Sequence, residues 1–366
     1  MTRRFVRTAA AVALLVPTLV ACSDGQDVVH AGAPRTVTPP PPPPVPTKPS
    51  LVRYVSPTGD NHATGSIDRP WRTLTHALRR IYAGQVLFVR GGTYHEQIDH
   101  VRLHDGTSTA PITVLSYPGE NPVLDGSVSL RRPEYWLIDN LDVAGDQHAR
   151  SQPSFMVKVI GGQHWTWENS EFSGTTGRAN VLITGFGVGE PFGFRFVGNC
   201  LHGLPSPPAG STNLFLGSMV SGASGTVARN VVFNSEDQPN VRIGSGAGAP
   251  VRVQVRLNTI YGGALGIDVR GRPHHVKISK NIVGGGSAPA MIRFPRGRTR
   301  GVRLISNIAV NTEQLLRPEV RKMVQKQQRG YGNLAVSQDP GFVDTSRCDG
   351  FRPGLDAVLP YGALAP

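Results

Sequence analysis

The chain has 366 residues, with 38 Lys and Arg against 25 Asp and Glu and a formal net charge of +13. This excess of positive charge favours anionic partners such as acidic polysaccharide, another anionic polymer of a cell envelope, or an anionic membrane surface. The sequence contains no recognisable nucleic-acid-binding motif, so we do not expect a nucleic-acid partner.

The N-terminal residues 1–21 have the pattern of an export signal. Arg3, Arg4 and Arg7 precede an apolar stretch that is too short to span a bilayer comfortably. The stretch ends in "LVAC", whose last residue is Cys22, and this motif resembles the lipobox of bacterial lipoproteins. The resemblance implies cleavage before Cys22, lipidation of its thiol, and an extracytoplasmic protein anchored to the cell membrane. The alternative is an ordinary signal peptide that happens to contain a cysteine.

Residues 22–50 are predicted to form a tether, because they lack apolar periodicity and their proline run favours an extended polyproline II conformation. Residues 51–366 are enough for one large domain, expected to be monomeric, and they contain no apolar run long enough to span a membrane. Cys200 and Cys348 could form a disulfide. The place of Cys200 beside an expected core position favours a buried thiol instead.

An asparagine recurs along this domain at spacings of 23 to 31 residues. Each one ends a short strand-like run, such as "WTWEN" or "VKISKN", and further strand-like residues follow at once. The seven positions are Asn140, Asn169, Asn199, Asn230, Asn258, Asn281 and Asn307. A second group of short alternating runs lies between them. This period predicts stacked coils, in which equivalent strands form long parallel sheets and the asparagines stack in a ladder.

Three segments resemble the right-handed parallel β-helix proteins of the pectin-lyase-like superfamily. Residues 54–98, from "YVSPTGD" to "GGTYHEQI", resemble the N-terminal module of extracellular members. "YPGENPVLDGS" (117–127) and "QDPGFVD" (338–344) resemble the second-coil and closing segments. The resemblance covers most of residues 51–345. It implies an all-β fold, a right-handed parallel β-helix (solenoid) with a short N-terminal capping helix, which apolar residues at helical spacing place over 73–82.

Because this fold hosts many activities, the chemistry must be sought in side chains on the outer face of a sheet. A glycoside hydrolase would show paired carboxylates on neighbouring coils. Glu236 and Asp237 are the only adjacent acids of the repeat region, and they fall in an expected turn. A calcium site would need several converging carboxylates, and the repeats are poor in acids. We therefore predict no metal site, although calcium stays open; His274 and His275 lack a third ligand at a telling spacing.

A basic face is the strongest candidate for a binding site. Between residues 242 and 303 the sequence has twelve Lys or Arg and one acid, Asp268. Strand alternation places Arg242, Asp268, Arg270 and Arg293 on the outer face of successive coils, with the apolar residues between them pointing inward. We expect Asp268 to hold one guanidinium group through a bidentate pair.

The same column extends backwards to Lys158, with Thr184 and Phe215 between it and the arginines. Lys158 and Phe215 are therefore predicted to bind substrate. Trp165 and Trp167 share one face of a strand and would stack against sugars if exposed, although core packing is the commoner place for such rings.

The segment 313–333 is basic and weakly amphipathic. We expect a helix or loop over the last coils, or a phosphate-contacting segment, and Pro318 argues against one uninterrupted helix.

The basic column suits a chain of carboxylated or sulfated sugars. β-Elimination on a uronate needs a cation that neutralises the carboxylate and a base that removes the neighbouring proton. Arg242, Arg270 and Arg293 could divide these catalytic roles, with Asp268 orienting one of them. The sequence thus predicts a cell-surface protein that binds acidic polysaccharide and, if it is an enzyme, cleaves it as a lyase. The alternatives are a non-catalytic adhesion or envelope structural protein, a glycoside hydrolase, or arginines that only keep the face soluble.

Overall fold

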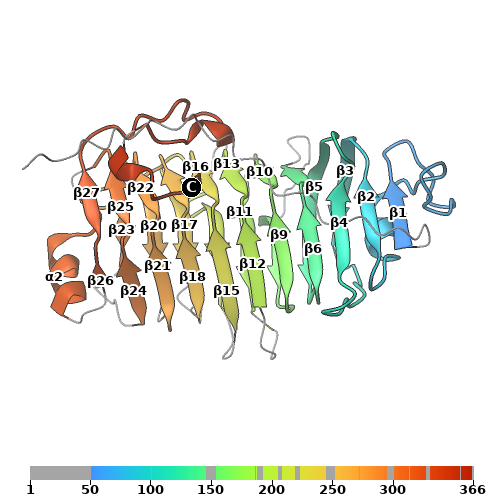
Figure 1. Ribbon diagram of the computed structural model, residues 1–366, viewed down its shortest axis with the longest axis horizontal. Coiled ribbons are helices and arrows are strands. Elements are labelled where there is room, and N and C mark those ends of the chain that lie inside the picture. Colours follow the sequence, from blue (N-terminus) through green and yellow to red (C-terminus); the bar gives the residue numbers. More distant parts are fainter. Residues whose placement is uncertain are drawn as a thin grey trace, which may run out of the picture. The chain divides into compact units, whose positions relative to one another are not determined.

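The computed structural model describes residues 51–99, 101–145, 154–185, 187, 193–204, 208–218, 223–244, 252–271, 273–294, 301–312, 314–326, 330–354 and 356–364. The predicted export signal, Cys22 and the proline-rich tether lie outside the described residues. The described chain is built from short parallel strands that repeat in the same order on successive coils (Figure 1). The predicted all-β solenoid is confirmed.

One sheet has 11 strands, which lie side by side along the long axis of the molecule (Figure 1). Its neighbouring strands are parallel, and equivalent residues of successive coils face each other. The strands are β1 (Val52–Val55), β2 (Val86–Val89), β4 (Ile112–Ser116), β6 (Trp136–Asp139), β9 (Trp165–Glu168), β12 (Gly193–Val197), β15 (Ser224–Ala228), β18 (Val253–Arg256), β21 (Val276–Ser279), β24 (Val302–Ile305) and β26 (Gly330–Tyr331).

The second sheet has 16 strands in two limbs that meet at β5 (Pro122–Arg131), which also pairs with β3 (Gly92–Ile98). The long-strand limb continues through β8 (Phe155–Ile160), β11 (Ala179–Thr184), β14 (Thr212–Leu216), β17 (Pro239–Ile243), β20 (Leu265–Val269) and β23 (Ile292–Arg293). The short-strand limb consists of β7 (Asp142–Ala144), β10 (Glu171–Ser173), β13 (Cys200–His202), β16 (Val231–Phe233), β19 (Thr259–Tyr261), β22 (Ile282–Gly284), β25 (Ile308–Val310) and β27 (Leu334–Val336).

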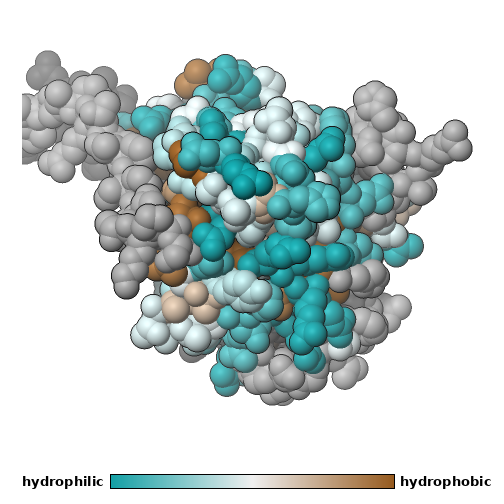
Figure 2. Space-filling model, turned by 90° about the vertical axis from the view of Figure 1, so that its right-hand side faces the viewer, coloured by the Kyte–Doolittle hydropathy of each residue, from teal (hydrophilic) through white to brown (hydrophobic). Residues whose placement is uncertain are grey.

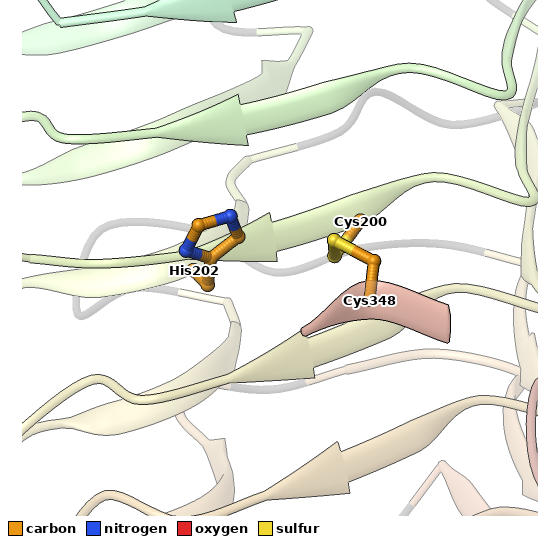
Figure 3. Close-up of side chains that lie close together, drawn as sticks. All are labelled: Cys200, His202 and Cys348. Carbon is orange, nitrogen blue, oxygen red and sulfur yellow. A yellow bond between two sulfur atoms is a disulfide. The ribbon is translucent and has the colours of Figure 1, made fainter. Parts of the chain in front are cut away.

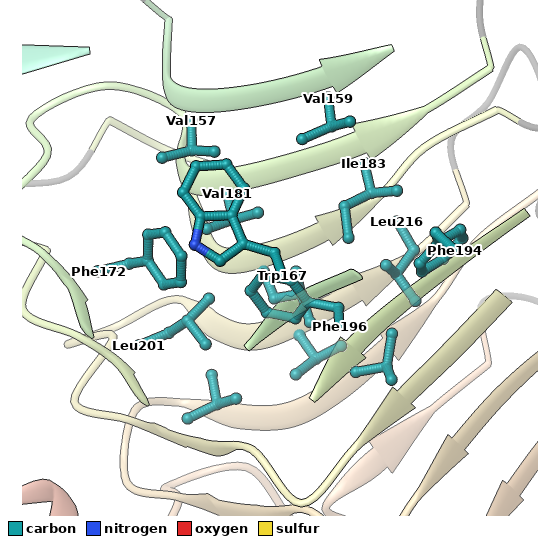
Figure 4. Close-up of a cluster of buried hydrophobic side chains, with 14 of the residues drawn as sticks. Val157, Val159, Trp167, Phe172, Val181, Ile183, Phe194, Phe196, Leu201 and Leu216 are labelled. Carbon is teal, nitrogen blue, oxygen red and sulfur yellow. The ribbon is translucent and has the colours of Figure 1, made fainter. Parts of the chain in front are cut away.

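Each coil passes from the long-strand limb to the 11-stranded sheet, then to the short-strand limb, and back. Side chains alternate between interior and surface along every strand, so apolar residues at every second position fill the coils. Figure 4 shows Trp167, Phe172 and Phe196 packed inside, with Val181 and Ile183 of the long-strand limb beside them. Stacking buries these side chains, because one coil alone cannot cover its own apolar face.

Trp165 and Trp167 both point into this core, with 3% and 1% of their surface exposed. The Trp165 ring stacks on Phe194, with 5.2 Å between ring centroids, and its indole N–H donates to the Gly161 carbonyl. The indole N–H of Trp167 donates to the Ser170 hydroxyl. The prediction that these two rings bind sugars is therefore wrong. Alternation correctly placed them on one face of β9, and that face is the interior.

An asparagine ladder follows the turns between the 11-stranded sheet and the short-strand limb. Its members are Asn199, Asn230, Asn258, Asn281, Asn307 and Asn333. The Oδ1 atom of each later member accepts a hydrogen bond from the backbone N–H of the member before it, at 2.9–3.2 Å. Each Nδ2 donates to a backbone carbonyl of the preceding coil. These polar groups are satisfied only while successive coils stay in register.

Two of the seven predicted ladder positions are wrong. Asn140 and Asn169 adopt left-handed backbone angles, with φ of 54° and 53°, and their amides bond outside the ladder. Ser170 occupies the ladder position on that coil, and its N–H donates to Oδ1 of Asn199. Asn333 extends the ladder by one coil beyond the predicted end. Asparagine occurs at both kinds of position. It tolerates the left-handed backbone angles of the turns, and its side-chain amide can hydrogen-bond within the buried ladder.

A second, shorter asparagine stack was not predicted. Nδ2 of Asn180 donates to Oδ1 of Asn213 at 2.7 Å, and Nδ2 of Asn213 donates to Oδ1 of Asn240 at 3.0 Å. All three side chains are fully buried near the starts of β11, β14 and β17. The stack therefore fixes the register of the long-strand limb.

Helix α1 (Leu74–Leu78) caps the first coil as predicted, although it is shorter than the expected 73–82. Thr73 is its N-cap, and the Glu96 carboxylate accepts hydrogen bonds from the first two backbone N–H groups of the helix at 2.6 and 2.9 Å. The apolar side chains of α1 are buried against the core. Figure 2 shows mostly hydrophilic side chains at this end of the molecule.

The C-terminal residues return along the short-strand limb (Figure 1), with 3₁₀ turns at Cys348–Gly350 and Asp356–Val358. Phe351 and Val358 are fully buried there against outward-facing apolar side chains of this limb. Cys348 forms a disulfide with Cys200 of β13, with the Cα atoms 5.8 Å apart (Figure 3). The expectation of a buried thiol at Cys200 is therefore wrong. The chain itself covers this side of the solenoid.

Helix α2 (Pro318–Lys326) lies within the basic segment near the last coils. Proline suits the first turn of a helix, where its missing N–H would have no partner, so Pro318 begins this helix instead of interrupting one. Val320 is buried in the main core with Leu315 and Leu316, so the segment helps to cover the last coils. Within the described ranges, no helix has the length and apolar character needed to cross a membrane.

The asparagine ladder predicts a specific pattern of stability loss. We expect Asn258→Ala to lower the free energy of unfolding by about 1–3 kcal/mol, because it leaves the buried N–H of Asn230 without its acceptor. Asn169→Gly is the matched control outside the ladder, since glycine tolerates the left-handed angles there. Urea unfolding of both variants would measure the difference, and equal losses would show that the ladder does not hold the coils.

Candidate functional site

The candidate site lies on the outer face of the long-strand limb. Its side chains form one column, because each residue pairs with its equivalent on the next coil. The column is Ser129, Lys158, Leu182, Phe215, Arg242, Asp268 and Arg293. Neighbouring strands lie about 4.8 Å apart, so the column runs along the length of the solenoid. The predicted stacking of the last three residues is confirmed.

The alternation that produced this prediction also holds, since Val241, Ile243 and Ile267 are buried in the core. One position in the column was predicted wrongly. Leu182, and not Thr184, stands between Lys158 and Phe215, while Thr184 pairs with Ile160. Alternation allowed either residue, because the two lie on the same side of β11. Only the register between coils distinguishes them.

Three arginines surround one carboxylate, and we call Arg242, Arg270, Arg293 and Asp268 the arginine cluster. Oδ2 of Asp268 accepts from Nε of Arg270 at 2.7 Å, and Oδ1 accepts from Nε of Arg293 at 3.0 Å. Nε of Arg242 lies 3.7 Å from Oδ2. The predicted bidentate pair is wrong, because each carboxylate oxygen bonds a different arginine. Alternation also missed that Asp268, although it lies on the outer face, is fully buried.

The charge of Asp268 is held by its neighbours. Burial raises the pKa of Asp268, but the hydrogen bonds and charges of Arg293 and Arg270 outweigh burial and bring the pKa below its usual value. The hydrogen bond to Asp268 raises the pKa of Arg293 in turn. Asp268 is therefore ionised at neutral pH and screened from solvent. An ionised Asp268 can position Arg270 and Arg293 through the hydrogen bonds that it accepts from them.

Arg242 is the most buried cation of the cluster, with 11% of its side chain exposed. Its Nη1 donates to the Gly210 carbonyl, and its guanidinium carbon lies 5.8 Å from the centre of the Phe215 ring. Among the described residues, its buried Nε and Nη2 have no hydrogen-bond partner, although Nε lies within ion-pair distance of Asp268. Burial and the positive charge of Arg270 lower the pKa of Arg242. Because an unpaired buried donor is costly, this pattern indicates a place for an anionic ligand group.

Arg270 and Arg293 present the accessible part of the cluster, with 42% and 48% of their side chains exposed. Among the described residues, only the Nε atom of each guanidinium group is hydrogen-bonded, which leaves the terminal amino groups available. Three guanidinium groups face one carboxylate, so the cluster keeps an excess of positive charge. Lys158 and the half-buried Phe215 continue the column. This arrangement can bind a carboxylate or sulfate through paired donors.

In the part of the chain that the structure describes, one group of side chains has the arrangement of metal ligands: Cys200, His202 and Cys348 (Figure 3). Both cysteines are joined in the disulfide, so neither offers a thiolate. His202 pairs with Glu171 at 2.9 Å between Nε2 and Oε1. This group lies on the short-strand limb, apart from the arginine cluster.

Comparison with known proteins bears on the fold. Residues 53–187 match a family model described as Pel9A-like, right handed beta helix region. The crystal structure of pectate lyase Pel9A matches with a TM-score of 0.54 and 13% identity, covering 82% of this chain and 84% of that chain. The fold is a right-handed parallel β-helix. The resemblance in fold to the pectin-lyase-like proteins is thereby confirmed.

Two curated proteins match parts of this chain. A segment of 141 residues is 37% identical to pectate lyase PEL9 of Emericella nidulans, covering 36% of this chain and 34% of that protein. A segment of 82 residues is 44% identical to the uncharacterized protein YwoF of Bacillus subtilis, covering 22% of this chain and 17% of that protein. The matched segments thus span about a third or less of the curated relatives. The family-model match ends at residue 187, so the arginine cluster lies beyond it and must be judged on its own geometry.

The lowered pKa of Asp268 predicts an acid-dependent contribution to stability. A carboxyl with a depressed folded-state pKa stabilises the fold above its unfolded pKa of about 3.9, and this contribution is lost as the pH falls through the folded value. Asp268→Asn should therefore lower the free energy of unfolding at pH 7 by about 1–3 kcal/mol, less than for a fully buried ion pair, because two of the arginines can turn to solvent. Below about pH 4 the difference from wild type should shrink.

Urea unfolding between pH 7 and pH 2.5 would measure this difference, with the exposed Asp237→Asn as the control. A stability difference between Asp268→Asn and wild type that does not depend on pH would contradict the electrostatic role of Asp268.

Proposed function

We propose that this β-helix binds acidic polysaccharide along the outer face of its long-strand limb, with the arginine cluster as the main anion site. The observation that carries the proposal is the arrangement around Asp268. One buried carboxylate fixes Arg270 and Arg293 through Nε, and no other described residue is hydrogen-bonded to their terminal amino groups. The guanidinium groups are therefore positioned in advance, and binding loses little side-chain freedom.

The column also favours a polymer over a single anion. Lys158, the apolar Leu182 and Phe215, and the arginine cluster follow one another on consecutive strands. A sugar chain presents both carboxylates and apolar ring faces, and the column offers a partner for each. The segment shared with pectate lyase PEL9 supports a polysaccharide as the ligand class.

A second candidate function is cleavage of a uronate-containing glycan by β-elimination. Arg270 and Arg293 would neutralise the substrate carboxylate, and Arg242 would act as the base. The burial of Arg242 and its lowered pKa favour this role. The proton would pass from C5 of the uronate to Arg242 in its neutral guanidine form, the C–H electrons would form the C4–C5 double bond, and the C4–O bond would break. The leaving oxygen would take a proton from water, and Arg242 would return its proton to the hydroxide that remains. The 11% exposure of Arg242 favours binding without turnover.

The binding proposal predicts that Arg270→Ala together with Arg293→Ala weakens affinity for polygalacturonate or alginate about tenfold or more, because paired charge-assisted hydrogen bonds are lost. The double lysine variant should keep part of the affinity, since lysine retains the charge but not the planar fork. Isothermal titration calorimetry of residues 51–366 at two salt concentrations would measure both variants. Arg69→Ala with Arg72→Ala, two exposed arginines of the N-terminal module, is the charge-matched control. Equal effects of the two double alanine variants would remove the cluster from the binding site.

The same samples distinguish the candidate reactions. Ultraviolet absorbance of an unsaturated uronate would establish elimination, and Arg242→Gln should then abolish it without loss of binding. New reducing ends without this absorbance would indicate hydrolysis instead. Binding with neither signal would establish the non-catalytic function.

We also propose that the protein is held outside the cytoplasm by a lipid on Cys22, with 22–50 as a spacer, which supports a role at a cell surface. The export pattern of residues 1–21 and the "LVAC" motif support this placement. Cys22→Ala should move the protein from the membrane fraction to the soluble extracytoplasmic fraction after expression in a bacterium. An unchanged membrane fraction would contradict lipidation at this residue.

A further inference from the structure

We infer that the outer face of the 11-stranded sheet, from β12 to β24, is a second binding surface for carboxylated polysaccharide. This surface shares its ligand class with the proposed function but uses none of the residues of the arginine cluster. We call it the second basic face and define it by Arg195, Arg252, Lys277 and Arg303. All four side chains are exposed.

The register of the sheet lines up most of this face in one column. The column runs through Thr166, Arg195, Thr226, Gln254, Lys277 and Arg303 on six consecutive strands. Every one of these side chains can donate a hydrogen bond, and none is acidic. The donors face outward because the apolar residues between them, such as Phe194, Val255 and Ile278, fill the interior.

The charges of this column are not balanced within the sheet. Lys277 and Arg303 pair directly on adjacent strands, where like charges destabilise each other. Glu168 lies at the edge of the face and interacts with Arg195, but from β12 to β24 the described strands of this sheet carry no acid. An anionic ligand would relieve this repulsion.

A shallow hollow of about 510 Å³ lies over the start of this column. Arg195 and Arg252 contribute the cations of its lining, and Gln163, Thr166, Thr226 and Gln254 contribute neutral donors and acceptors. Its volume falls within the range of small-ligand sites, about 300–1,000 Å³. Guanidinium, amide and hydroxyl groups in one hollow match the carboxylate and hydroxyl groups of a uronate.

The spacing of charges favours a polysaccharide over a nucleic acid. Arg195 and Lys277 are separated by Thr226 and Gln254 on the two strands between them. Neutral donors between cations suit a chain in which hydroxyl groups separate the carboxylates. A single-stranded nucleic acid would need exposed aromatic rings for its bases, and the aromatic side chains of β12, Phe194 and Phe196, are buried.

The second basic face is distinct from the arginine cluster because the two lie on different sheets. The chain passes from the long-strand limb at Ile243 to the 11-stranded sheet at Val253, and Arg252 stands at the end of that connection. The third side of the coil is covered by the C-terminal residues. The two sides that the described C-terminal residues leave uncovered therefore both carry basic columns.

The test uses the purified protein and three probes, namely polygalacturonate, alginate and hyaluronate, with neutral dextran as the reference. Arg195→Gln, Lys277→Gln and Arg303→Gln are combined in one variant. The matched control combines Arg69→Gln, Arg72→Gln and Arg102→Gln, three exposed arginines near the N-terminal end. Circular dichroism would establish that both variants fold, which surface substitutions should not prevent.

The decisive comparison is made in the Arg270→Ala, Arg293→Ala variant. In this variant the arginine cluster is disabled, so we assign the binding that remains to the second basic face. We expect the glutamine triple variant to weaken that residual binding about tenfold and to flatten its salt dependence, because three exposed ion pairs that salt screens are lost. Methyl esterification of polygalacturonate should remove the same part of the binding.

Three outcomes would overturn the inference. One is an equal effect of the control triple variant. Another is wild-type affinity for all three probes that does not exceed affinity for dextran. The third is a triple variant that loses binding to phosphatidylserine vesicles but keeps binding to the acidic glycans, which would assign the face to an anionic membrane. Wild-type affinity in the Arg270→Ala, Arg293→Ala variant would count against the proposed function and leave this inference unaffected.

Discussion

Register between coils is the constraint on which both the fold and the candidate site depend. Strand side chains alternate with a period of two, so a slip of one residue would exchange the interior and surface side chains of a whole coil. The asparagine ladder opposes such a slip, because each buried amide needs partners on the neighbouring coils. The second stack acts at the site itself. Asn180, Asn213 and Asn240 each stand two residues before a member of the column, and Asn240 thus helps to place Arg242 beside Asp268.

The arginine cluster and the second basic face differ in how their positive charges are stabilised. In the arginine cluster, the buried carboxylate of Asp268 compensates part of the charge and fixes the guanidinium groups, at the expense of burying an ion. On the second basic face, the cations stay solvated, so their repulsion is weak and screened by salt. The cluster is therefore suited to oriented recognition of one carboxylate. The second face is suited to weaker contacts that add up along a polymer.

The sequence carried enough information for the general architecture and for the direction of most site residues. Alternation around Val241 and Ile267 placed Arg242 and Asp268 outward, and the period of the asparagines predicted stacked coils. The predictions that were wrong depend on how neighbouring coils align with one another. The residue pattern of a single coil does not determine this alignment. Alternation predicted Thr184 between Lys158 and Phe215, where the structure has Leu182, because alternation does not fix the register between strands.

Local sequence patterns likewise could not predict the burial of Asp268 or the pairing of Cys200 with Cys348. Alternation gives the direction of Asp268 but not the three arginines that fold over it. Cys200 and Cys348 are 148 residues apart in the sequence, and they meet only because the C-terminal residues return along the short-strand limb. That return covers the outward apolar side chains of the short-strand limb. Each of the other two sides of the described coils carries a basic column that runs across many strands. A small anion would use one point of such a column, whereas a linear polyanion can contact several strands at once, and each further contact is made at a high effective concentration. The repeating geometry of the solenoid thus favours a ligand that is itself a repeating chain.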